Sequence, residues 1–235
     1  FALTNGATLS TGEWRTLSGG GVFCESTNVM LANCVLAGNS ASSYGGAAVS
    51  GWLSNCTLMG NSAAAAGGAV NSTIYDSTVT GNFSAHDGGG VNGGILVNCT
   101  LIGNSAGANG GGGYQSTLVR CQVIGNSAAF AGGGQYGGSL DSCLVVGNSA
   151  SGGGGVSPYN VGHGQPGLTP LNNCTVVGNT PNGTWYCTLT NCIVYFNGTG
   201  NSNNIDGGTI WSSCTSPLPA SGVGNITNDP VFLDL

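Results

Sequence analysis

Charge is what this sequence has least of. Charged residues make up 4% of the 235-residue chain, against roughly 25% in an average soluble protein. Lysine is absent, and Arg15 and Arg120 are the two basic residues. Because phosphate backbones and anionic lipid surfaces are held by clustered basic side chains, the composition argues against nucleic-acid and membrane-surface partners. The net charge of −6 is spread along the chain and favours solubility.

Long hydrophobic runs are also missing. No segment approaches the roughly 18 consecutive apolar residues that a membrane-spanning helix needs, so we expect no membrane insertion. The chain begins at Phe1, without a basic segment followed by an apolar one that would mark a signal peptide. We interpret it as a processed chain or a piece of a longer one. An extracellular or cell-surface location after removal of an export signal is the expectation.

Glycine, in contrast, is abundant at 46 residues. It has no strict three-residue period, which excludes collagen. In a helix each glycine costs roughly 1 kcal/mol relative to alanine, and no stretch between glycines keeps a helical period. The apolar fraction of 40% is ordinary and sufficient for a core. The composition therefore favours an all-β fold.

An internal repeat fills most of the chain. The phrase "NCTLMGNSAAAAGGAV" at 55–70 returns as "NCTLIGNSAGANGGGG" at 98–113. Its aligned cysteine positions are Cys34, Cys56, Ser77, Cys99, Cys121, Cys143, Cys174, Cys192 and Cys214. They recur with a period of about 22 residues, which indicates stacked structural repeats. The step from Cys143 to Cys174 is longer than this period, and the step from Cys174 to Cys192 is shorter.

Two apolar columns accompany the cysteines. Three residues earlier stands a large apolar side chain: Leu31, Leu53, Ile74, Leu96, Leu118, Leu140, Leu171, Leu189 and Trp211. Two residues later stands Leu or Val, which shares one strand face with the cysteine. The leucine can face the same interior only if the chain bends just before the cysteine. Asn is common there, and Asn tolerates the left-handed conformation of a sharp corner.

A second corner has Gly followed by Asn. The asparagines are Asn39, Asn61, Asn82, Asn104, Asn126, Asn148 and Asn179. Stacked amides can hydrogen-bond from rung to rung as an asparagine ladder. A glycine-rich third turn follows, as in "AGGAV". We therefore predict a right-handed parallel β-helix, or β-solenoid, with three short strands and about 22 residues per rung and about nine to ten rungs.

The expected organisation has three parts. Residues 1–18 form an N-terminal rung, cap or docking segment. Residues 19–216 form the β-helix repeats, with a loop insertion at about 150–169. Residues 217–235 form a closing segment.

The phrases "GNSAAAAGGAV" and "GNSASSYGGAA" resemble the GGA(I/V) and FxxN repeats of chlamydial polymorphic membrane proteins and, more broadly, secreted bacterial right-handed parallel β-helix proteins. "NITNDPVFLDL" at 225–235 is similar to the Asp-Pro-x-Phe segment that follows such repeats. The resemblance covers roughly residues 19–235. It implies the β-helix fold, and it implies no single activity because the fold serves adhesins, autotransporter passengers, lyases and tailspikes.

The ten cysteines favour an oxidising, extracellular setting, yet eight of them form one inward column. Free buried thiols acting as small hydrophobes are the main interpretation. Disulfides between neighbouring rungs would need local adjustment. Cys24 and Cys187 lie off the column and are candidates for a bridge, including one between subunits. A column of identical ligands cannot surround a tetrahedral zinc ion, so we expect no metal and no cofactor.

No constellation of catalytic residues is apparent. Asp76 and Asp141 would lie three rungs, or about 14 Å, apart and cannot act as a carboxylate pair. Tyr114 and Tyr136 would stack on adjacent rungs, either as an outward platform for sugars or as fillers where Val49 and Val70 stand in earlier rungs. With Tyr159 and His163 of the loop insertion, they form the candidate surface for a ligand or partner.

The sequence thus favours a non-enzymatic extracellular structural protein, a surface or fibre-forming solenoid that associates end to end or laterally with copies of itself. Two alternatives remain. The chain could be an adhesin passenger that binds a surface receptor, or a carbohydrate-binding or lyase-like module that binds a glycan.

Overall fold

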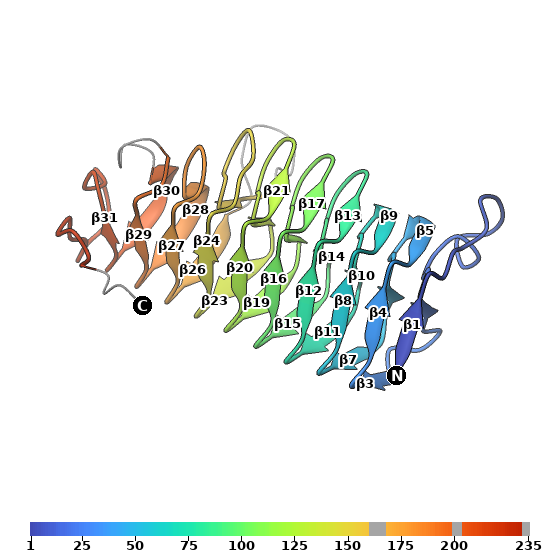
Figure 1. Ribbon diagram of the computed structural model, residues 1–235. Helices are drawn as coiled ribbons and strands as arrows, with labels where there is room; N and C mark the ends of the chain where they lie inside the picture. The colour runs from blue at the N-terminus through green and yellow to red at the C-terminus, as the bar shows by residue number, and fades with distance from the viewer. Residues whose placement is uncertain (160–167, 199–203, 232–235) are drawn as a thin grey trace.

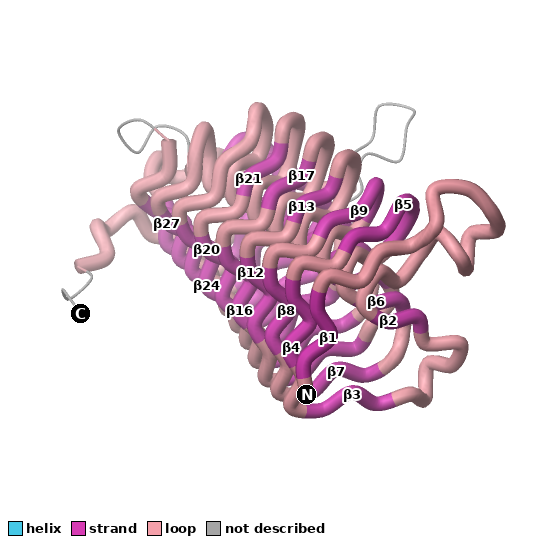
Figure 2. Tube along the Cα trace, turned by 45° about the vertical axis from the view of Figure 1, so that its right-hand side comes forward, coloured by secondary structure: helices cyan, strands magenta, loops and turns pink. Residues whose placement is uncertain are grey.

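A computed structural model describes residues 1–159, 168–198 and 204–231. The chain winds into a solenoid whose rungs lie side by side along one axis, with the first strand at one end and the last strand at the other (Figure 1). Parallel strands stack into three sheets, and no helix occurs in the described ranges (Figure 2). The prediction of an all-β solenoid with three strands per rung is confirmed.

The first sheet has ten strands, one from each successive rung. They are β1 (Ala2–Thr4), β4 (Val35–Ala37), β8 (Thr57–Met59), β12 (Thr78–Thr80), β16 (Thr100–Ile102), β20 (Gln122–Ile124), β24 (Leu144–Val146), β27 (Thr175–Val177), β29 (Ile193–Tyr195) and β31 (Cys214–Thr215).

The second sheet has two arms that meet at one long strand, because in most rungs a corner divides the chain into two short strands. One arm is β2 (Val22–Phe23), β6 (Ala48–Val49), β10 (Ala69–Val70), β14 (Val91–Asn92), β18 (Gly113–Tyr114), β22 (Gln135–Tyr136) and β25 (Val156–Ser157). The other is β3 (Met30–Ala32), β7 (Trp52–Ser54), β11 (Thr73–Tyr75), β15 (Ile95–Val97), β19 (Thr117–Val119), β23 (Ser139–Asp141) and β26 (Thr169–Asn172). The long strands β28 (Thr184–Thr190) and β30 (Ile205–Trp211) span both.

The third sheet is the shortest and covers only the first part of the solenoid. Its five strands are β5 (Ser40–Tyr44), β9 (Ser62–Ala65), β13 (Phe83–Ser84), β17 (Ser105–Ala106) and β21 (Ser127–Ala128). After β21 the corresponding stretches are joined by single bridges, such as Ser127 to Ser149 and Ser149 to Thr180. The sheet therefore stops where the regular period of the repeat stops.

The bend before the cysteine occurs as predicted. Asn55 and Asn98 have φ values of 51° and 54°, and even Arg120 is held at 52°. This corner lets Leu53, Cys56 and Leu58 enter one core although odd and even spacings separate them. All three are at most 2% exposed. The interior is thus built from repeated columns of Leu, Cys and Leu or Val.

The alignment is wrong by one residue at its last member. Ile193 follows Cys192 and pairs with Cys214, so Ser213 occupies the cysteine column and Cys214 faces outward. The left-handed corner is accordingly at Ser212, with φ 49°, and Ile210 instead of Trp211 continues the leucine column. The step from Cys192 to its equivalent, Ser213, is therefore one residue shorter than the alignment predicts. The error arose because Cys214, a cysteine, stands directly beside the true position, Ser213.

A ladder of buried asparagines runs along the second corner. In each rung the side-chain Oδ1 accepts two hydrogen bonds from the preceding asparagine: Asn82 donates its backbone N–H to Asn104 at 3.0 Å and its Nδ2 at 2.9 Å. The Nδ2 of Asn104 also donates to the carbonyl of Val79 at 2.9 Å. Asn104 is fully buried. Each amide therefore connects neighbouring rungs through both of its polar ends.

The ladder is longer than predicted. Asn179 donates to Asn197, and the backbone of Asn197 donates to Oδ1 of Asn204 at 2.9 Å. Sequence reasoning missed Asn197 because Phe196 stands where earlier rungs have glycine. Phe196 takes the same left-handed conformation, with φ 53°. The spacing in the sequence could have identified Asn197, because Asn197 follows Cys192 at the same distance at which Asn104 follows Cys99.

The glycine pairs of the third turn pack against this ladder. A Cβ on Gly90 would lie 3.2 Å from the side chain of Asn104 and would clash with the carbonyl of Gly112 on the next rung. A Cβ on Gly89 would clash with the carbonyl of Ser105. The motif GNSxxxxGG is therefore one physical unit, since the amide ladder requires a side-chain-free backbone opposite it.

Replacing Asn104 by alanine should lower the free energy of unfolding by at least about 2 kcal/mol, because two donors of Asn82 and the carbonyl of Val79 lose buried partners. Urea denaturation would measure this. Asn98→Gly is the matched control, since Asn98 is exposed and its left-handed φ suits glycine, and it should change stability by less than about 1 kcal/mol. Equal losses in the two variants would contradict the role of the ladder.

Candidate functional site

All ten cysteines are free thiols, and those of the column hydrogen-bond to the backbone. The Sγ of Cys143 lies 3.2 Å from the carbonyl of Asp141 and 3.5 Å from that of Leu118, and it accepts the backbone N–H of Cys121 at 3.4 Å. The thiol is thus more than a small hydrophobe, because it provides polar partners at the corner where the chain bends.

Serine replaces cysteine at two positions of the column and makes the same hydrogen bonds there. Ser77 Oγ donates to the carbonyl of Tyr75 and accepts the N–H of Cys56 at 2.9 Å. Ser213 Oγ donates to Trp211 and accepts the N–H of Cys192 at 3.0 Å. Cysteine and serine are therefore equivalent here, and the column is structural.

Cys24 and Cys187 lie off the column, as their positions in the sequence indicate. Cys24 follows β2, whereas Cys187 lies on β28, with six strands between them in the sheet. At about 4.8 Å per strand they are too far apart for a disulfide within one chain. Both are buried, and burial raises the pKa of each thiol.

The tyrosines form one cluster. Tyr114 and Tyr136 stack with ring centroids 5.5 Å apart and an interplanar angle of 18°, and Tyr159 packs edge-on against both at 6.3 and 6.0 Å. They continue the column of Val49 and Val70, which pack outside the main core. Tyr136 is only 9% exposed, Tyr114 is half-buried and Tyr159 is 38% exposed, so the three rings pack largely against one another. His163 lies outside the described residues.

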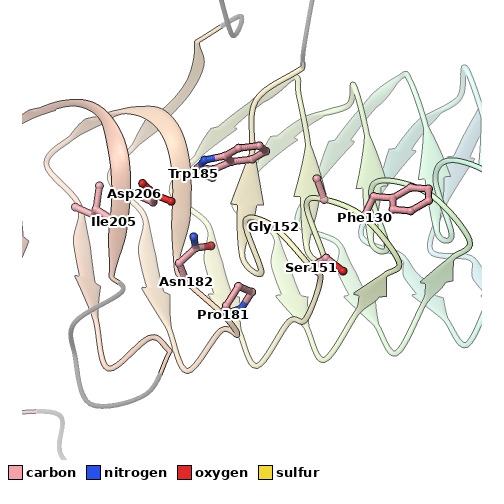
Figure 3. A pocket seen from close by; sticks show the side chains of 9 residues that line it. Phe130, Ser151, Gly152, Pro181, Asn182, Trp185, Ile205 and Asp206 are labelled. Atoms are coloured by element: carbon pink, nitrogen blue, oxygen red, sulfur yellow. The ribbon is translucent and has the colours of Figure 1, made fainter.

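A hollow with a richer chemistry begins in the rung of Tyr136 and extends over the next three rungs. It has a volume of about 780 Å³ and lies between the turns that follow β21 and the start of strands β28 and β30 (Figure 3). Its lining residues are Phe130, Ala131, Ser151, Gly152, Pro181, Asn182, Trp185, Ile205 and Asp206. The third sheet ends at β21, so no further strand of that sheet fills this space.

Two strands position the indole and the carboxylate that line the hollow. Trp185 and Asp206 are register partners on β28 and β30, which places them about 4.8 Å apart along the axis. They extend the outer column that contains Tyr136, since Tyr136 pairs with Ser157 and Val156 with Thr184. Trp185 is half-buried, whereas Asp206 is exposed. An indole and a carboxylate therefore stand side by side at the surface.

Polar groups from other rungs complete the hollow. Asn182 is 8% exposed, and its Oδ1 accepts the backbone N–H of Gly154 at 3.2 Å. Its amide nitrogen carries two further donors. Ser151 Oγ donates to the carbonyl of Ala129 at 2.7 Å, which leaves its lone pairs as acceptors. Phe130 is 65% exposed at the rim. The hollow thus combines two aromatic rings with donors and acceptors.

The sequence analysis did not identify this hollow as a candidate site. The hollow is assembled from four consecutive rungs, and one long step and one short step replace the regular period in the middle two. That irregularity was the available signal, because insertions in a repeat protein form loops on one face, which is often the binding face.

The fold defines a parallel β-solenoid repeat protein. Comparison with known proteins finds no matching family model, no matching curated protein and no matching solved structure. Among the residues that the structure describes, no group of three or more His, Cys, Asp or Glu side chains is placed to hold a metal ion. A search of the same ranges finds no helix with the length and apolar character to cross a membrane.

Cys143→Ser should retain stability to within about 1 kcal/mol, because serine makes the same contacts at Ser77. The thiol donates as a protonated group, since the neighbouring Cys121 thiol and burial raise the pKa of Cys143 to about 12. Cys143→Ala should cost about 1–3 kcal/mol through an unpaired carbonyl and a small cavity. Urea denaturation would compare the two, and a serine variant as unstable as the alanine variant would contradict the assignment.

Tyr114 should titrate at unusually high pH. Burial and the charge of Asp87 raise the pKa of Tyr114 to about 12, so the folded state favours the neutral phenol. The unfolded phenol ionises near pH 10, and the stability contributed by Tyr114 should therefore be lost as pH rises from about 10 to 12.

The difference between wild-type and Tyr114→Phe ultraviolet titration curves would report this pKa. Asp87→Asn should lower it. A Tyr114 transition near pH 10 in the folded protein would refute the prediction.

Proposed function

We propose that this chain is a non-enzymatic extracellular scaffold that binds carbohydrate in the hollow between Phe130, Trp185 and Asp206. The observation that carries the proposal is the composition of the hollow. Aromatic rings stack on the apolar faces of sugars, while carboxylate, amide and hydroxyl groups fix the hydroxyls. Trp185, Asp206, Asn182 and Ser151 provide these elements around one space of about 780 Å³.

The remaining solenoid supports the proposal as a rigid frame. The buried asparagine ladder and the parallel sheets fix each rung relative to the next, so strands β28 and β30 hold Trp185 and Asp206 in place before a ligand arrives. The resemblance of the GNSxxxxGGA phrases to secreted β-helix proteins supports a location outside the cell. End-to-end association into filaments, expected from the sequence, stays a separate prediction.

Carbohydrate binding can be tested with a panel of neutral, amino and acidic oligosaccharides and isothermal titration calorimetry. Trp185→Ala should weaken binding at least about tenfold, since an aromatic anchor contributes about 1.4 kcal/mol or more. Trp52→Ala is the matched control, because Trp52 is 45% exposed on β7, in the other arm of the second sheet. Absence of any saccharide binding, or equal affinity of the two variants, would refute the proposal.

A further inference from the structure

We propose that the hollow selects amino sugars, with the protonated amine held between the carboxylate of Asp206 and the indole of Trp185. The inference rests on the proposed function and names the ligand class of the same site. Its basis is the pairing of a carboxylate with an aromatic ring at one rim, where nothing in the described ranges neutralises the carboxylate.

The immediate geometry suits a cation. An ammonium group forms charge-assisted hydrogen bonds with a carboxylate and is attracted to the face of a tryptophan. Trp185 and Asp206 are neighbours on adjacent strands, and both line the same hollow (Figure 3). Asp206 is exposed and can reach a ligand without burying an unpaired charge, which would be costly.

Both arginines are engaged elsewhere. Arg15 pairs with Glu25 at 3.8 Å and lies over the Trp14 ring, near the N-terminal end of the solenoid. Arg120 donates its Nε to Asn98 Oδ1 at 2.8 Å at the corner before the cysteine column. Since lysine is absent from the whole sequence, no lysine or arginine lines the hollow.

Other ionisable groups on this side lie farther away. His86 is bonded through its carbonyl to Ala108, and Ala108 through its carbonyl to Phe130, which puts His86 two rungs, or about 10 Å, before the rim. Asp87 follows it and adds negative charge. The net charge of −6 also disfavours uronic acids and other anionic sugars.

The rest of the hollow fits a sugar ring better than a bare amine. Asn182, in the same rung as Trp185, can donate its amide nitrogen, and Ser151, one rung earlier, can accept. Phe130 offers a second apolar face. A pyranose with several hydroxyls uses these groups, whereas the single ammonium of a lysine side chain leaves them unused.

The test compares three oligosaccharides of equal length by calorimetry at pH 6: a glucosamine oligomer with free amines, its fully N-acetylated counterpart and a galacturonate oligomer. We expect the free-amine oligomer to bind at least about tenfold more tightly than the acetylated one, and the galacturonate oligomer to bind least. Raising the salt concentration should reduce this preference, because the Asp206 carboxylate is exposed.

Substitutions of Asp206 test whether its carboxylate causes the preference for the free-amine oligomer. Asp206→Asn should bring the free-amine and acetylated oligomers to within about twofold of each other. Asp206→Glu should retain part of the preference. Asp141→Asn, which removes a carboxylate on β23 away from the hollow, should leave it unchanged. Thermal unfolding of each variant would establish that the fold is intact.

The outcomes separate the two proposals. If the acetylated oligomer binds in a Trp185-dependent manner and Asp206→Asn changes nothing, the amino-sugar inference falls and carbohydrate binding stands. If no oligosaccharide binds, both fall. A lysine-containing peptide that binds as tightly as the glucosamine oligomer would overturn the inference in favour of a protein partner.

Discussion

The buried hydrogen bonds between stacked asparagine amides are the constraint on which the rest of this structure depends. Each amide uses its oxygen for the rung before and its nitrogen for the rung after, as Asn104 does between Asn82 and Asn126. The chain must therefore return to the same point once per rung. Because an unpaired buried amide would cost several kcal/mol, extra residues are accommodated only outside this corner. The long and the short step keep Asn148, Asn179 and Asn197 connected.

The interior columns follow from that constraint. A rung of this length encloses a narrow space, which suits Leu, Val and a small group at the corner. Either cysteine or serine can occupy that corner, because each can donate to the carbonyl two residues earlier, as Cys143 and Ser77 do. The free thiols of the column are thus a consequence of corner geometry. The glycine turn is a second consequence, since Gly90 leaves room for the ladder.

Much of this could be predicted from sequence because a solenoid repeats its own environment. The corners up to Asn191, the leucine column and the asparagine ladder follow from spacing alone. Prediction was wrong at Cys214, where two candidate residues, Ser213 and Cys214, compete for one position and only strand pairing decides. The hollow could not be predicted, because Ser151 and Asn182 come from rungs whose lengths break the period. Their proximity depends on where the third sheet ends, which no spacing encodes.

Regular and irregular parts of the chain therefore have different roles. Where the period is strict, a substitution in one rung disturbs its contacts with the rungs before and after it. The residues at these positions are therefore determined by the fold. Where the period breaks, after β21, the third sheet gives way to single bridges and the outer column changes from valine and tyrosine to Trp185 and Asp206. The ladder continues underneath through Asn179 and Asn197. A binding site needs side chains that are held rigidly in place. Here the surface side chains can differ from those of the repeat, because the asparagine ladder beneath them keeps the rungs fixed.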